Sequence, residues 1–240
     1  MGLVKAAIGD AVVTFMWIIC ASTIGAITSI IANMIGVQGM ASLAITTSLI
    51  FVISVLFGLI ADAFGGASFN ATGAIAFYIA GAGGDEDTLM STAIRFPAQA
   101  VGAVGGVLVL MELMPLEYKH MLEGPTLKVD LHTGAIAEGV LTFAITFVVL
   151  LIIIKGPKSL FWKNWMLSVA TMAVIVPGSS YTGPSMNPAN AFGWAYVNNK
   201  HNTWEQFYVY WICPSLGAIL AASFYRLVFP PPPASKPKTA

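Results

Sequence analysis

The chain has 240 residues, of which 57% are apolar and only 9% are charged, and its mean hydropathy is +0.81. A soluble domain usually carries about 25% charged residues, so this composition is typical of an integral membrane protein whose main partner is the lipid bilayer. The formal net charge is zero, so the composition suggests no nucleic-acid partner, which would call for an excess of basic residues. The two cysteines lie inside apolar runs and indicate neither a disulfide framework nor a metal site.

Six apolar stretches are long enough to cross a membrane, for which a helix needs about 20 residues. In chain order they cover about 8–32, 40–62, 92–114, 132–154, 164–181 and 204–228. Two shorter apolar segments, about 70–80 and 188–198, reach roughly half a membrane thickness at about 1.5 Å per residue. The sequence therefore predicts an all-α membrane protein with six transmembrane helices and two re-entrant half-helices.

Basic residues are divided unequally between the two sides of this arrangement. Three of the 11 lysines and arginines, Lys119, Lys128 and Lys200, fall on one side, and the other eight fall on the opposite side. The positive-inside rule then predicts that both termini are cytosolic. Lys236 and Lys238 near the end of the chain resemble a dilysine retrieval signal of the endoplasmic reticulum; a solvated basic tail is the alternative.

The two halves of the chain resemble each other. Three matches recur in the same order: Asp10–Phe15 with Glu138–Phe143, Phe69–Ala71 with Met186–Pro188, and Gly102–Ala103 with Gly217–Ala218. Each half contains three spans, so the second half must enter the membrane from the opposite face, as in an inverted repeat. We expect one domain over 1–240, with repeat one over about 5–114, repeat two over about 132–228 and a cytosolic tail over 229–240.

Each predicted half-helix begins at an asparagine, in the motifs Asn70-Ala71-Thr72 and Asn187-Pro188-Ala189. Asparagine is a favoured N-cap, and proline fits the first helical position. In an inverted repeat these two N-termini face each other near the membrane centre, where their dipoles make a positive centre that opposes cations and admits neutral polar solutes. The alternative is that each asparagine is only a cap.

Two acidic residues, Asp10 and Glu138, occupy matching places in the first and fourth spans. We expect both carboxylates to accept hydrogen bonds from backbone N–H groups of the re-entrant loops. A carboxylate within a membrane also suggests ion-coupled transport, which is the less favoured interpretation. The sequence offers no nucleophile–base set, so we expect no catalytic residue, no enzyme activity and no cofactor.

These motifs resemble those of aquaporins, the major intrinsic protein family, over about residues 5–228. The resemblance rests on Tyr181–Ala189, Gly66–Asn70, the paired carboxylates and Gln99–Ala103. The altered first motif, Asn190 and the lysine-bearing tail are similar to those of the plant small basic intrinsic proteins, subgroup one. The resemblance implies a homotetramer with one pore per subunit.

The resemblance also implies a selectivity constriction toward the non-cytosolic side, formed by Ile50, Ile175, Pro184 and Asn190. Orthodox water channels carry an aromatic residue, a histidine and an arginine among these four positions, whereas here none is aromatic or charged. The apolar members offer no hydrogen bonds, so water would depend on Asn190 and on backbone carbonyls.

The first motif departs from the family because alanine follows Asn70 where the family has proline. Alanine does not fix the backbone angle φ as proline does, so the sequence allows this half-helix to begin at Ala71 or one residue earlier. The hydroxyl of Thr72 can also form a local hydrogen bond. The leading functional hypothesis is a passive channel for water, with other small neutral solutes such as hydrogen peroxide as further candidates. The alternative is a weakly conducting or non-conducting membrane protein with a structural or interaction role.

Overall fold

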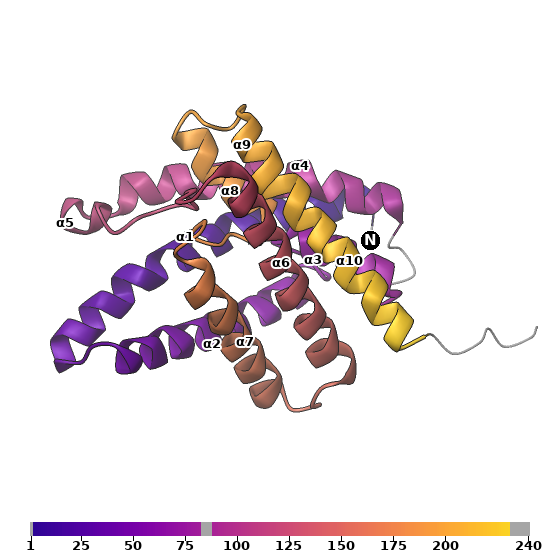
Figure 1. The fold of residues 1–240 in the computed structure, drawn as a ribbon, viewed down its shortest axis with the longest axis horizontal. Coiled ribbons are helices and arrows are strands. Elements are labelled where there is room, and N and C mark those ends of the chain that lie inside the picture. Colours follow the sequence, from indigo (N-terminus) through magenta and orange to yellow (C-terminus); the bar gives the residue numbers. More distant parts are fainter. Residues whose placement is uncertain (1, 83–87, 231–240) are drawn as a thin grey trace, which may run out of the picture.

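The computed structural model describes residues 2–82 and 88–230, and every regular element in these residues is helical (Figure 1). Six helical segments are long and apolar enough to cross a membrane. They are α1 (Leu3–Ile35), α2 (Met40–Ala63), α4 (Leu89–Leu113), α6 (Leu131–Leu150) with the π-helical turn η1 (Leu151–Lys155), α7 (Leu160–Gly178), and the run of α9 (Trp204–Phe207), η2 (Tyr208–Ile212) and α10 (Cys213–Val228). The predicted all-α class and six spans are confirmed. The tail lysines Lys236 and Lys238 lie outside the described residues.

Within the described residues there are three further, shorter helices: α3 (Ala71–Ala80), α5 (Leu116–Lys119) and α8 (Pro188–Val197). The two ten-residue helices, α3 and α8, lie at the positions predicted for half-helices. In Figure 1 they lie among the long helices.

One predicted span is displaced. The sequence predicts a helix over about 164–181, whereas α7 runs from Leu160 to Gly178. The chain leaves the helix at Gly178 because the amides of Tyr181 and Thr182 both donate to the Gly178 carbonyl, at 3.0 and 3.2 Å, and close a turn.

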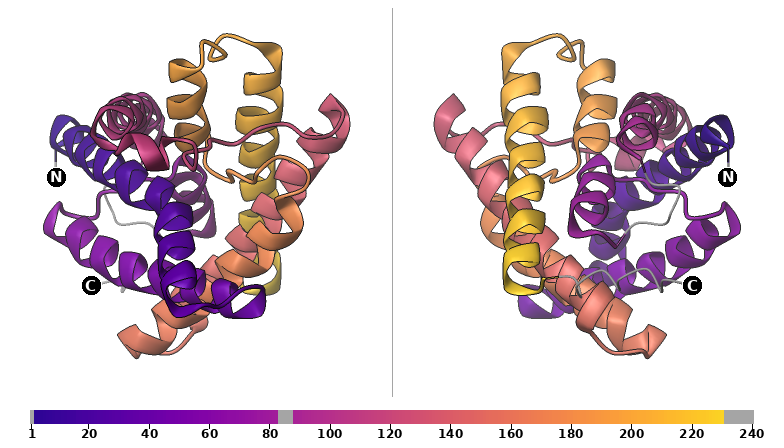
Figure 2. Two further views of the ribbon diagram at one scale, coloured as in Figure 1. Left: turned by 90° about the vertical axis from the view of Figure 1, so that its left-hand side faces the viewer. Right: turned by 90° about the vertical axis from the view of Figure 1, so that its right-hand side faces the viewer.

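The helices of the two halves pack in corresponding pairs. α1 packs most extensively on α4, and α6 packs in the same way on α10. Each half-helix lies against the last span of the other half: α8 packs on α4, and α3 packs on α10. Both views of Figure 2 show α6 and α10 side by side. This exchange places the N-termini of α3 and α8 between the two halves.

Glycines allow the closest helix approaches at matching places in the two halves. A Cβ added at Gly102 of α4 would collide with the backbone carbonyl of Ala11 in α1. One added at Gly217 of α10 would collide with the carbonyl of Gly139 in α6. Helices in lipid associate through such small residues, because the hydrophobic effect does not favour helix–helix over helix–lipid contact.

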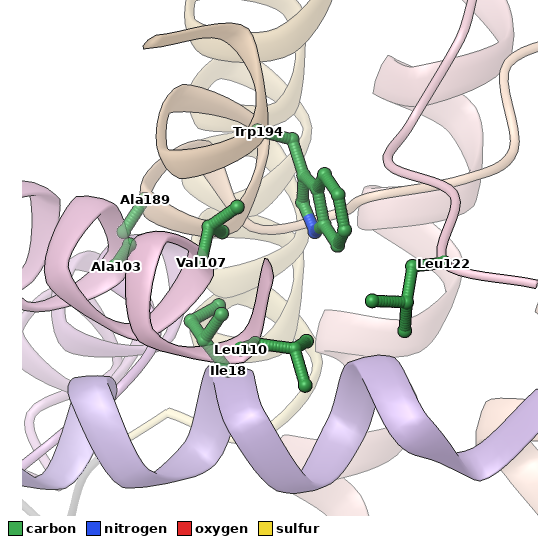
Figure 3. Close-up of a cluster of buried hydrophobic side chains, with 7 residues drawn as sticks. All are labelled: Ile18, Ala103, Val107, Leu110, Leu122, Ala189 and Trp194. Atoms are coloured by element: carbon green, nitrogen blue, oxygen red, sulfur yellow. The ribbon is translucent and has the colours of Figure 1, made fainter. Parts of the chain in front are cut away.

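The buried apolar core around α8 ties the second half-helix to the first half of the chain. Trp194 of α8 is 5% exposed and belongs to a cluster with Val107 and Leu110 of α4 and Ile18 of α1. Figure 3 shows its ring projecting toward Leu122, in the loop that follows α5. The tryptophan therefore holds α8 against both α4 and the connecting loop.

Candidate functional site

Both half-helices begin at the asparagines of the two motifs. Asn70 has φ −137° and ψ 115°, and its Oδ1 accepts a hydrogen bond from the Thr72 amide at 3.0 Å. Asn187 has φ −145° and ψ 103°, and its Oδ1 accepts from the Ala189 amide at 3.1 Å. Both are therefore N-caps in nearly the same extended conformation. The first half-helix begins at Ala71, the counterpart of Pro188, so alanine in place of proline does not shift its start.

The two motifs contact each other through crossed hydrogen bonds. The amide Nδ2 of Asn187 donates to the carbonyl of Phe69 at 2.8 Å, and Nδ2 of Asn70 donates to the carbonyl of Met186 at 3.3 Å. Each asparagine therefore bonds the carbonyl of the residue that precedes the other one. A carboxamide has two N–H donors, so each side chain keeps one N–H for a further acceptor.

Thr72 adds a bond across the motifs that only the first half-helix makes. Its hydroxyl lies 2.8 Å from Oδ1 of Asn70 and 3.1 Å from the carbonyl of Met186, and the residue is 2% exposed. The sequence predicts local bonding by this hydroxyl; the structure adds a contact with the opposite half of the chain. The corresponding position of the second half, Ala189, has no polar side-chain atom.

The two carboxylates are fully buried and accept hydrogen bonds from the re-entrant loops. Glu138 accepts from the amide of Ser185 at 2.9 Å, from the amide of Met186 at 3.0 Å and from the hydroxyl of Thr182 at 2.8 Å. Asp10 accepts from the amide of Ser68 at 2.8 Å. Both side chains are 0% exposed. The carboxylates therefore hold the backbone just before each asparagine.

Arg95, in α4, belongs to the site although no sequence motif indicated it. Its Nη1 is 3.3 Å from Oδ1 of Asp10 and 3.5 Å from the carbonyl of Gly66. Gln99, one turn later, donates through Nε2 to the other oxygen of Asp10 at 2.9 Å. The internal repeat carries a signal for this position. Gly102 and Gly217 are matching residues of the two halves, and the same spacing along the chain pairs Arg95 with Tyr210. Tyr210 also bonds a re-entrant loop, because its hydroxyl donates to the carbonyl of Thr182 at 3.2 Å.

Comparison with known proteins shows the family to which the chain belongs. The model of the family described as major intrinsic protein matches residues 1–225. The chain belongs to the major intrinsic protein family. A solved member, the aquaglyceroporin from Plasmodium falciparum, has the same fold with a TM-score of 0.70 and 16% sequence identity, over 95% of this chain and 98% of that one.

Within the family the chain groups with plant proteins of one kind. It is 58% identical over 238 residues to "Aquaporin SIP1-2" of Zea mays, covering 98% of this chain and 97% of that protein. It is 54% identical to "Aquaporin SIP1-1" of Arabidopsis thaliana, covering 99% and 98%. Identity falls to 33% for "Probable aquaporin SIP2-1" of Arabidopsis thaliana, with 96% and 94% covered. The resemblance to the small basic intrinsic proteins, subgroup one, is confirmed.

The four constriction positions implied by the family lie on four parts of the structure: α2, α7, the second re-entrant loop and α8. Ile50 is in α2 and is 8% exposed, and Ile175 is in α7, which packs on α2. Pro184 lies in the second re-entrant loop, where a Cβ added at Gly178 would come within 2.7 Å of its Cγ. Asn190 donates through Nδ2 to the hydroxyl of Ser185 at 3.3 Å. This loop is therefore bonded to Asn190 as well as to Glu138.

Proposed function

We propose that this protein is a passive transmembrane channel for water, with other small neutral solutes as further permeants. The observation that carries the proposal is the pair of half-helix N-termini that meet through the crossed bonds of Asn70 and Asn187. Each amide keeps one N–H that a passing water oxygen can accept. The names of the plant relatives, which are aquaporins, support the same function.

Ions and protons are excluded, in this proposal, by the half-helix dipoles. Each helix N-terminus carries about half a positive charge, and α3 and α8 bring two of them together at one place. A cation there meets repulsion in a medium of low dielectric constant. A water molecule that accepts a bond from an asparagine amide is oriented by it, which interrupts proton relay along a file of waters.

We further propose that the protein is a homotetramer with one pore per subunit, and that Ile50, Ile175, Pro184 and Asn190 form the constriction. Both termini are placed in the cytosol by the distribution of lysine and arginine. The two tail lysines make the endoplasmic reticulum the proposed membrane. These assignments rest on the sequence pattern and on the family.

A second candidate function is a weakly conducting or non-conducting protein that uses the fold for a structural or interaction role. One observation favours it: Ile50 at the proposed constriction is apolar and only 8% exposed, so this position offers water neither a polar partner nor much free surface.

Stopped-flow shrinkage of proteoliposomes decides between the two candidates. The channel predicts faster shrinkage than in empty vesicles, with an activation energy below that of the lipid pathway. Shrinkage at the rate of empty vesicles, with the protein shown to be inserted and folded, would favour the structural role. Separate assays with hydrogen peroxide, urea and glycerol then define the permeant solutes.

A further inference from the structure

Three aromatic rings pack directly beside the first asparagine motif. The indole of Trp17 in α1 stacks on the ring of Phe69, with centroids 4.0 Å apart and planes at 16°. Phe57 of α2 meets Trp17 edge to face at 5.2 Å and Phe69 at 6.0 Å. Phe69 immediately precedes Asn70, and its carbonyl accepts the bond from Asn187. Trp17 therefore contacts the residue, Phe69, through which the two half-helices meet.

The position of Trp17 on its helix shows which way its surface faces. At about 100° per residue, Trp17 lies within roughly 20° of Asp10 and between the directions of Val13 and Thr14. Those three residues are each 0% exposed, so Trp17 is at the centre of the buried face of α1. Val12 lies on the opposite face and is 36% exposed.

Trp17 nevertheless keeps accessible surface, since it is only partly buried. Its indole N–H has no hydrogen-bond partner among the described residues, and it is not among their fully buried, unpartnered polar atoms. A partly exposed ring at the centre of an otherwise buried face opens onto the interior of the molecule rather than onto lipid. The indole N–H therefore has access to a ligand inside the protein.

We propose that Trp17 is a specificity-determining residue of the permeation path: its ring, fixed by the stack on Phe69, narrows the path beside Asn70, and its N–H donates to the passing solute. This inference rests on the proposed function as a channel. It assigns size selection to a residue beside the first asparagine motif, in addition to the four constriction positions. It also supplies a polar group to a path whose isoleucines offer none.

Hydroxyl-radical footprinting of the unmodified protein tests whether Trp17 faces internal water, and it does not depend on conduction. Radicals formed from water oxidise side chains next to water, and mass spectrometry locates the products. We expect several-fold more oxidation at Trp17 than at Trp194, a tryptophan that is 5% exposed and enclosed by the apolar core. Oxidation of Trp17 at or below the level of Trp194 would overturn the proposal.

Permeability of two matched leucine variants tests the size selection. Trp17→Leu removes the ring that faces the path, whereas Phe57→Leu removes a ring of the same cluster that is 1% exposed. We expect Trp17→Leu to raise the ratio of urea to water permeability several-fold, and Phe57→Leu to leave it unchanged. Equal ratios in both variants would show that the ring is only a packing element.

Trp17→Phe isolates the N–H, because it keeps the stacked ring. Loss of one hydrogen bond along the path predicts a fall in water permeability of about five-fold, with the urea-to-water ratio unchanged. Unchanged water permeability in this variant would contradict the donor role. If the unmodified protein conducts no water although Trp17 is oxidised, the proposed function fails while the placement of Trp17 on an internal aqueous path stands.

Discussion

The side-chain amide of Asn187 donates a 2.8 Å hydrogen bond to the backbone carbonyl of Phe69, a residue 118 positions earlier in the chain. The reciprocal bond from Asn70 to the Met186 carbonyl is longer, at 3.3 Å. These bonds fix the two half-helices against each other at their positive ends. The proposed selectivity thus depends on a few polar atoms, each of which a conservative substitution can test.

Asn187→Asp should increase cation leak. The new carboxylate would lie at the N-terminus of α8, where it offsets the positive dipole, and it would no longer donate to the Phe69 carbonyl. Potassium efflux from proteoliposomes measures the leak. Asn198→Asp, at the opposite end of the same helix, is the matched control and should leave the leak at the level of the unmodified protein. An unchanged leak in Asn187→Asp would argue against exclusion by dipoles.

Ala71→Pro should stabilise the protein by about 0.5–1 kcal/mol, because proline restricts the unfolded chain. Ala71 is the first residue of α3, and Asn70 before it already has the extended conformation that a following proline requires. Ala74→Pro is the control: the Ala74 amide donates to the Asn70 carbonyl at 3.2 Å, so proline there should cost about 3 kcal/mol. Thermal unfolding in detergent compares them, and a lower midpoint for Ala71→Pro would mean that the ring does not fit.

Thr72→Val should lower stability by about 1 kcal/mol, through loss of the hydroxyl that joins Asn70 to the Met186 carbonyl. Valine keeps the shape of threonine, so the change isolates the hydrogen bonds. Thr72→Ser keeps the hydroxyl and should retain most of this stability. Chemical denaturation of all three proteins gives the comparison. Stability that is kept in the valine variant and lost in the serine variant would contradict this prediction and assign the role of Thr72 to its methyl group.

Glu138→Gln should destabilise the protein by about 2–3 kcal/mol, because hydrogen bonds to a charged acceptor are strong and the new NH₂ group would face backbone donors. Three donors bond this carboxylate. Glu112→Gln, at an exposed position of α4, is the control and should change the midpoint of thermal unfolding little. If both variants unfold at the same temperature, the carboxylate does not support the second re-entrant loop.

Gly124→Ala should destabilise the protein by about 1–3 kcal/mol through overpacking. An added Cβ would collide with Trp194, the ring that Figure 3 shows beside Leu122. Gly25→Ala, in α1, meets no atom within 4 Å and should be neutral or slightly stabilising. Thermal unfolding of the two variants, compared with hydrogen exchange in α8, shows whether the loop holds that helix.

The sequence by itself determined the elements of this fold. The length of the apolar stretches predicts the six spans, and an asparagine before an apolar segment predicts each half-helix start. These signals are local, because a helix needs only its own hydrogen bonds and a cap. For the same reason, Asn70 caps α3 although alanine follows it in place of proline.

Only the tertiary structure decided which side chains meet. Three contacts join segments that are distant in the sequence: the hydrogen bond of Thr72 to Met186, the ion pair of Arg95 with Asp10, and the stack of Trp17 on Phe69. Membrane helices are apolar on the lipid-facing side as well as on the packed side, so hydrophobic periodicity does not distinguish the two. The contact of Trp17 with Phe69 became visible only when α1 was packed against α2, α4 and the first re-entrant loop.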